Sequence, residues 1–92
     1  MRAARSDENQ QSIIDALRKI GARVKSTHMV GNGFPDLVIA FRRRTVLLEV
    51  KMPGEGLTKE QIKFFAEWNG ELHIARSPEE AVRLVIGEKA LA

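Results

Sequence analysis

Three stretches of the chain carry apolar residues at the spacing of an amphipathic helix. The first follows Ser6, a residue that can cap a helix, and ends at Gly21. The second begins with the capping box Thr58–Gln61 and ends at Gly70, and the third begins with a cap at Ser77. Aromatic residues at helical spacing are expected in the core rather than against nucleic-acid bases. The apolar positions are Ile13, Ile14, Leu17 and Ile20 in the first helix, Ile62, Phe64, Phe65, Ala66 and Trp68 in the second, and Ala81, Val82, Val85 and Ile86 in the third.

Four shorter stretches predict β-strands, because they are rich in β-branched or bulky residues or alternate apolar with polar positions. They span residues 22–28, 37–41, 45–50 and 72–75. The two central strands meet at the basic turn Arg42-Arg43-Arg44, so we expect them to pair as a hairpin. The predicted order α-β-β-β-α-β-α indicates a small α/β fold in which helices flank a mixed sheet.

The open end of this hairpin brings charged residues together. If the strands pair about the turn, the numbers of facing residues add up to about 86, so Asp36 faces the segment Glu49–Lys51. Glu49 and Lys51 point to one side of their strand and Val50 to the other. Strands lie about 4.8 Å apart, so the Asp36 and Glu49 carboxylates can reach one divalent cation with Lys51 beside it. An ion pair between Lys51 and either acid is the structural alternative.

Composition narrows the class of protein. The 92 residues make one small domain, of which residues 1–6 are expected as a flexible tail. The absence of Cys excludes disulfides, thiolate zinc sites and cysteine nucleophiles, and leaves oxygen atoms as the obvious metal ligands. A net charge of +3 and a pI near 9.7 suit a polyanionic partner. No apolar run resembles a signal peptide or a membrane span, so we expect a soluble, cytoplasmic protein that does not bind membranes.

Two further features bear on ligands and partners. The loop of residues 29–34 contains Gly31 and Gly33, but no Gly-Lys-Ser/Thr sequence follows, so it is not a phosphate-binding loop and no small-molecule cofactor is expected. His28, beside this loop, can ligate metal or carry protons, although a single His is more often structural. A chain of this size buries only about two thirds of its unfolded surface, which favours a second subunit.

Four motifs follow one another along the chain. They are Glu8-x-x-Gln11, Gly33-x-Pro35-Asp36, Glu49-Val50-Lys51 and Leu57-Thr58-x-x-Gln61. Pro35-Asp36 followed by Glu49-x-Lys51 resembles the signature of the PD-(D/E)xK nucleases, and the whole series resembles the VRR-NUC (virus-type replication and repair nuclease) domain. This resemblance extends from about Asp7 to about Ile86.

The resemblance implies an endonuclease that hydrolyses phosphodiester bonds in DNA and depends on a divalent metal. Asp36, Glu49 and the backbone carbonyl of Val50 would hold Mg²⁺ or Mn²⁺, with Glu8 completing the site directly or through water. Lys51 would orient or deprotonate the attacking water and offset charge on the phosphate.

Two of the implied site residues also have a simpler structural explanation. Glu8 lies opposite the apolar face of its predicted helix, where an acid in the first turn interacts with the helix dipole. The resemblance nonetheless makes Glu8 the helix-borne acid of the active site, with Gln11 one turn further on. Gln61 completes the capping box, and the resemblance also makes it a catalytic residue near the metal.

The resemblance further implies a branched DNA substrate. Stand-alone members of this family, from viruses and bacteria, are similar to Holliday-junction resolvases in DNA repair and act as homodimers, whose two-fold symmetry matches a four-way junction. Cleavage of flaps or of DNA without selectivity is the alternative. For the basic turn, protection of a sheet edge is an equally good explanation. The candidate DNA contacts are Gly33, Arg42, Arg43, Arg44, Lys59 and Lys63.

Two other functions compete with this one. The first is a catalytically silent module that binds nucleic acid or a larger protein, in which Asp36, Glu49 and Lys51 are merely ion-paired. The second is a restriction-type endonuclease, which the small size and the lack of an obvious recognition helix disfavour. Metal-dependent cleavage distinguishes the nuclease from the silent module.

Overall fold

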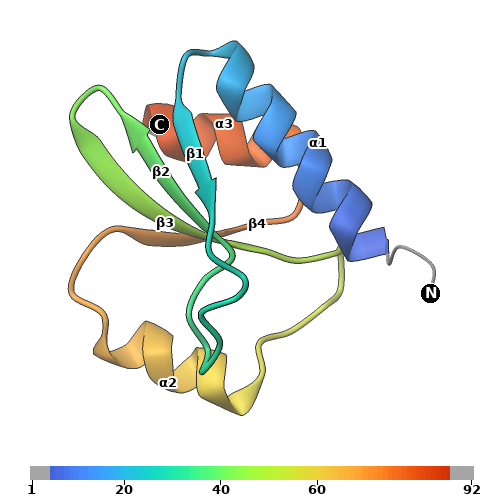
Figure 1. Ribbon diagram of the computed structural model, residues 1–92. Helices are drawn as coiled ribbons and strands as arrows, with labels where there is room; N and C mark the ends of the chain where they lie inside the picture. Colours follow the sequence, from blue (N-terminus) through green and yellow to red (C-terminus); the bar gives the residue numbers. More distant parts are fainter. Residues whose placement is uncertain (1–4, 88–92) are drawn as a thin grey trace, which may run out of the picture.

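The computed structural model describes residues 5–87, which form a four-stranded sheet and three helices (Figure 1). The observed order is the predicted α-β-β-β-α-β-α, which confirms the α/β fold class. Residues 1–4 of the expected tail lie outside the described residues. The elements are α1 (Arg5–Lys19), β1 (Arg23–Ser26), β2 (Leu37–Phe41), β3 (Arg44–Val50), α2 (Lys59–Glu67), β4 (Leu72–Ala75) and α3 (Pro78–Ile86).

The sheet is mixed, with the strand order β1-β2-β3-β4. β1, β2 and β3 are antiparallel neighbours, and β4 runs parallel to β3. In the central hairpin Leu37 faces Leu48, which is within one residue of the expected register. The turn contains only Arg42 and Arg43, whose φ values of 50° and 66° are those of a two-residue turn that matches the twist of the strands. Arg44, expected in the turn, is therefore the first residue of β3.

The core lies on one face of the sheet. α1 and α3 pack against each other and cover that face (Figure 1). Ile86, expected in the core, is 38% exposed because Ala81 and Val85 already form the buried stripe of α3 and Ile86 lies about 100° further round the helix. The buried core residues are Ile13, Ile14, Leu17, Ala22, Leu37, Ile39, Phe41, Val46, Leu48, Val50, Ala75, Ala81 and Val85.

Two of the three predicted helix starts are confirmed. Thr58 caps α2 in a full capping box with Gln61, and Ser77 caps α3 with Pro78 at its start. The prediction of Ser6 as a cap is wrong, because α1 already includes Arg5 and Ser6 lies in its first turn. α2 ends at Glu67, three residues before the predicted end.

α2 lies apart from the core, beside the loop that connects β1 and β2 (Figure 1). None of its residues is buried. The expectation that its aromatic residues belong to the core is therefore wrong: α1 and α3 occupy the face of the sheet where such a core would form. Instead Phe64 stacks on Trp68 at 5.2 Å between ring centroids and contacts Phe34 edge-on at 5.3 Å. This small aromatic cluster attaches α2 to the β1–β2 loop.

Gly33 makes the second attachment of α2. Its φ of 81° favours glycine, and a Cβ at this position would lie 2.5 Å from the backbone oxygen of Glu60 in α2. The close approach that Gly33 permits is thus with protein backbone, and its contact with DNA stays a prediction.

Among residues 5–87, no helix has both the length and the apolar character needed to cross a membrane.

Candidate active site

The hairpin places Asp36 and Glu49 opposite each other at the open end of β2 and β3. Leu37 pairs with Leu48, so the preceding Asp36 adjoins Glu49 and Val50. The Val50 N–H donates to Asp36 Oδ2 at 2.9 Å. Thr27 holds the backbone before β2: its N–H donates to the Asp36 carbonyl at 2.7 Å and its hydroxyl to the Pro35 carbonyl at 2.8 Å. These bonds fix the Asp36 carboxylate beside the end of β3.

Glu49 is an acid buried in an otherwise apolar strand. It is only 2% exposed. Its neighbours Leu48 and Val50 point into the core, so Glu49 points to the other face of the sheet. Its Oε2 accepts a hydrogen bond from Gln61 Nε2 at 3.0 Å and lies 3.6 Å from Lys51 Nζ. Its Oε1 is buried and has no hydrogen-bond partner. A buried carboxylate oxygen without a partner is costly, which makes it an open ligand position.

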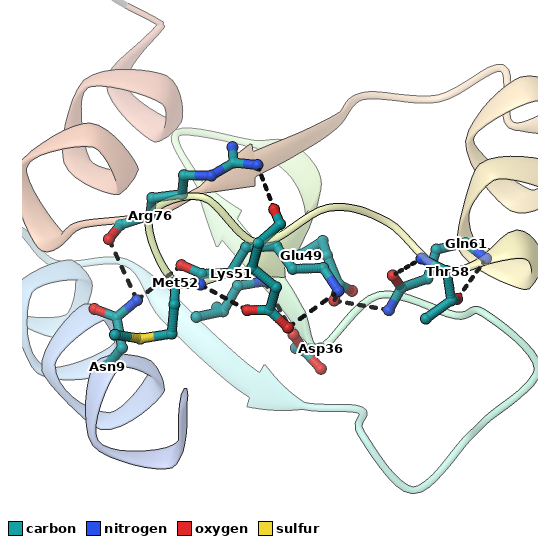
Figure 2. Close-up of polar contacts among 10 residues, drawn as sticks. Asn9, Asp36, Glu49, Lys51, Met52, Thr58, Gln61 and Arg76 are labelled. Atoms are coloured by element: carbon teal, nitrogen blue, oxygen red, sulfur yellow. Dashed lines mark hydrogen bonds and ion pairs between the residues drawn. The ribbon is translucent and has the colours of Figure 1, made fainter. Parts of the chain in front are cut away.

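Lys51 is buried between two acids. It is 5% exposed, and its ammonium lies 3.6 Å from Glu49 Oε2 and 3.7 Å from Glu55 Oε2 (Figure 2). The predicted ion pair with Glu49 is therefore present. The Lys51 backbone is held at the same time, because its N–H donates to the Ala75 carbonyl and its carbonyl accepts from Asn9 Nδ2 at 3.0 Å. Sheet and helix thus fix the position from which the lysine side chain extends.

Burial changes the protonation of Glu49. Loss of solvent contact and then the nearby Asp36 charge raise the pKa of Glu49 from 4.5 to about 7, although the Lys51 ammonium opposes the rise. A cation beside the two carboxylates would reverse this effect, because it favours their ionised forms.

These side chains line one cavity of about 260 Å³. Its lining residues are Gln10, His28, Asp36, Glu49, Val50, Lys51 and Glu55. Asp36 and Glu49 offer hard oxygen ligands, and the free Oε1 of Glu49 is available to a cation, so the residues present fit Mg²⁺ or Mn²⁺. Within the described part of the chain, no three His, Cys, Asp or Glu side chains are grouped so that they can hold a metal. The fit therefore rests on two carboxylates.

The structure does not bring Glu8 to these carboxylates. Glu8 is exposed, and α1 lines the cavity through Gln10 instead. The two residues are about 200° apart around the helix, so the face that presents Gln10 to the cavity turns Glu8 away. Gln11, expected near the site, donates to Asp15 Oδ1 at 2.9 Å on the helix surface. The role of Glu8 as a ligand stays a prediction without a contact to support it.

Gln61 makes the capping contact expected of it and also contacts Glu49, while its role as a catalytic residue near a metal stays a prediction. Its Oε1 accepts from the Thr58 N–H at 2.9 Å and completes the capping box, while its Nε2 donates to Glu49 (Figure 2). The amide therefore links the start of α2 to the acid at the end of β3.

The candidate DNA-binding residues lie in three places. Arg42 and Arg43 are exposed at the tip of the hairpin, about five strand residues or roughly 17 Å from Asp36. Arg44 is not free to bind phosphate, because it forms an ion pair with Glu71 and donates to the Val85 carbonyl. Lys59 and Lys63 are exposed on α2, the helix from which Gln61 donates to Glu49.

Sequence reasoning missed several residues around Lys51. Asn9 bridges the Lys51 and Arg76 carbonyls, and Arg76 Nη2 donates to the Glu55 carbonyl at 2.8 Å (Figure 2). Glu55 follows Lys51 by four residues, which is the only signal in the sequence that could have indicated their pairing. The contacts of Asn9, Gln10 and Arg76 join segments far apart in the chain, so a single sequence gave no indication of them.

Comparison with known proteins identifies the family and supports the fold. A sequence model of the VRR-NUC domain matches residues 2–83. A solved structure described as a VRR_NUC domain has the same fold, with a TM-score of 0.78 and 16% identity over 95% of this chain and 100% of the other. A comparison with curated proteins finds no match. The family match spans most of the sequence, and the chain therefore belongs to the VRR-NUC domain family.

Proposed function

We propose that the chain is a DNA endonuclease that depends on a divalent metal. The observation that carries the proposal is the convergence of Asp36, Glu49 and Lys51 in one cavity, with Glu49 Oε1 buried and unpaired. The ion pair with Lys51 leaves that buried oxygen without a partner. A bound cation would supply one.

The two carboxylates and the Val50 carbonyl would hold Mg²⁺ or Mn²⁺. When bound, such a cation stabilises negative charge on the phosphate as a Lewis acid. Gln61 keeps Glu49 Oε2 occupied, and Oε1, which has no hydrogen-bond partner, is the atom that would bind the cation. The Val50 N–H holds Asp36 Oδ2 in the same way and leaves Oδ1 for the ligand.

Lys51 supplies a positive charge from the protein itself, in addition to the proposed metal ion. Its ammonium donates hydrogen bonds to the attacking water or to a phosphate oxygen, and it offsets the charge that develops on the phosphate. In the hydrolysis, the water oxygen forms a new bond to phosphorus and the bond to the leaving sugar oxygen breaks. A proton passes to that oxygen, so no covalent enzyme intermediate is required.

We further propose that the protein acts on branched DNA as a homodimer. α2 has no buried residue, and Ile62 on it and Trp68 directly after it are 56% and 41% exposed, which suits a surface covered by a second copy. Lys59, Lys63, Arg42 and Arg43 are exposed and available to DNA phosphates. Light scattering tests the dimer: a mass near 10.3 kDa at micromolar protein contradicts it.

The test of the proposed function is cleavage of labelled four-way junction, flap, single-stranded and duplex DNA with Mg²⁺, Mn²⁺ or EDTA. We expect metal-dependent cleavage that is lost in Asp36→Asn and Lys51→Ala and retained in Lys19→Ala, whose lysine is exposed at the end of α1. Symmetric paired cuts in the junction would support the branched substrate. Absence of cleavage of every substrate with either metal contradicts the nuclease.

The silent binding module is the second candidate, and one observation favours it. Lys51 is paired with two carboxylates, and only two acids converge as ligands among the residues described. Such a module binds DNA with an affinity that falls with salt, shows no cleavage, and loses stability rather than turnover when Asp36 is replaced.

A further inference from the structure

Glu55 makes more contacts than an exposed loop residue requires. It lies in the segment of residues 51–58 that connects β3 to α2, and its carboxylate is 44% exposed. Oε1 accepts from the Met52 N–H at 2.8 Å, and the Glu55 N–H donates to the Met52 carbonyl at 3.0 Å. These two bonds close a tight turn directly after Lys51. The turn leaves Oε2 facing the Lys51 ammonium at 3.7 Å.

The turn is attached to the rest of the fold through Arg76. The guanidinium of Arg76 donates to the Glu55 carbonyl at 2.8 Å, and the Arg76 N–H donates to Glu80 Oε1 at 2.7 Å. Asn9 then joins the Arg76 carbonyl to the Lys51 carbonyl. Side chains from α1 and from the connection between β4 and α3 therefore fix both Lys51 and the turn that carries Glu55.

The two acids beside Lys51 respond differently to a bound cation. Glu49 is a proposed ligand, and a cation on it cancels much of its attraction for the ammonium. Both oxygens of Glu55 are already engaged, Oε1 by the Met52 N–H and Oε2 by the Lys51 ammonium, so Glu55 is not a proposed ligand and keeps its attraction for Lys51. A lysine side chain has a flexible four-carbon stem and lacks the rigid planar group of arginine, so it needs a partner to stay in one position. With the cation present, Glu55 is that partner.

Building on the proposed function, we propose that Glu55 is a positioning residue for cleavage, which holds the Lys51 ammonium at the cavity while a cation occupies Asp36 and Glu49. Arg76 and Asn9 support this role by fixing the turn. Glu55 itself does not touch the reacting phosphate, and its effect on the reaction passes through Lys51.

The test compares Glu55→Gln and Glu55→Asp with the wild type. Glutamine keeps an oxygen for the Met52 N–H and removes only the charge, whereas aspartate keeps the charge on a shorter side chain. Glu67→Gln, at an exposed position in the last turn of α2, is the matched control. We expect Glu55→Gln to lower kcat by 10- to 100-fold with little change in KM, Glu55→Asp to lie between it and the wild type, and the control to match the wild type.

A second readout follows Lys51 directly. In protein carrying ¹³C at the lysine ε carbons, with the signal assigned by Lys51→Arg, we expect Mg²⁺ to displace the Lys51 resonance in Glu55→Gln more than in the wild type. Circular dichroism establishes that each variant is folded. Wild-type cleavage by folded Glu55→Gln overturns the proposal, and so does a loss of kcat with an unmoved Lys51 signal. Failure of the wild type itself to cut DNA overturns the proposed function instead, before any substitution is compared.

Discussion

Replacing the buried acid of the site is expected to stabilise the protein when no metal is present. Glu49→Gln keeps the shape of the side chain and an oxygen for Gln61 Nε2, and it removes a charge that burial and Asp36 disfavour. Because the pKa of Glu49 is higher in the folded than in the unfolded chain, the folded state binds more protons and its stability falls as the pH rises through about 7. The variant avoids that loss.

The size of the effect follows from the pKa. One unit of pKa corresponds to about 1.4 kcal/mol. Ionising a carboxyl whose pKa rises from 4.5 to about 7 therefore costs the folded state about 3 kcal/mol above pH 8 and less than about 1 kcal/mol near pH 5. This is a large part of the total stability of a small domain, and it corresponds to a rise in Tm of about 10 °C or more in Glu49→Gln at pH 8.

The assay is urea unfolding followed by circular dichroism, in EDTA, at pH 5, 7 and 8.5. Glu67→Gln, an exposed acid on α2, is the control and is expected to differ little from the wild type at each pH. Adding Mg²⁺ should stabilise the wild type and not Glu49→Gln. A variant that is no more stable than the wild type at pH 8.5, or a gain that is the same at all three pH values, refutes the reasoning.

Three other substitutions test separate parts of the structure. Asp36→Asn keeps an oxygen for the Val50 N–H, so we expect stability within about 1 kcal/mol of the wild type in urea and loss of metal-dependent cleavage; full cleavage activity would remove Asp36 from the site. Glu71→Gln removes the charged partner of Arg44. In the wild type, the hydrogen bond from Arg44 lowers the pKa of Glu71, and the ion pair therefore contributes stability at neutral pH that is lost as the pH falls through that lowered pKa. Since the pair is about one third exposed, we expect a loss of about 0.5 kcal/mol at pH 7 and a smaller one at pH 3, and an equal loss at both would exclude a charge effect. Gly33→Ala places a Cβ 2.5 Å from the α2 backbone at a φ of 81°, so we expect about 1 to 3 kcal/mol of destabilisation and weaker cleavage; unchanged unfolding would contradict the described packing of α2.

The sequence predicted the parts of the fold that depend on local chemistry. The cap at Thr58 and the cap at Ser77 each require only a few neighbouring residues, and both are present. The register of the hairpin follows from its two apolar runs and the turn between them, and the prediction that Asp36 faces the segment Glu49–Lys51 agrees within one residue with the observed pairing.

Predictions failed where the outcome depends on residues that are distant in the chain. Arg44 is held by Glu71 and Val85, so its position in β3 rather than in the turn depends on other elements. The aromatic residues of α2 have the spacing of a core helix, but the periodicity does not reveal that α1 and α3 already cover the sheet. For Glu8 the helical wheel correctly indicated a solvent-facing side chain, and its role as a metal ligand, which came from family resemblance alone, stays a prediction.

The two-residue turn of the hairpin has a consequence for insertions and deletions. Asp36 precedes Arg42 by six residues, and Glu49 follows Arg43 by six. Successive side chains of a strand point to opposite faces, so one residue added to or removed from either strand would send one of the two acids into the apolar core. Extra residues inserted between Arg42 and Arg43 leave the pairing of the strands unchanged. We therefore expect natural or engineered variation in length to be tolerated at the hairpin tip and excluded from the strands, although the tip lies at the far end of the sheet from the site.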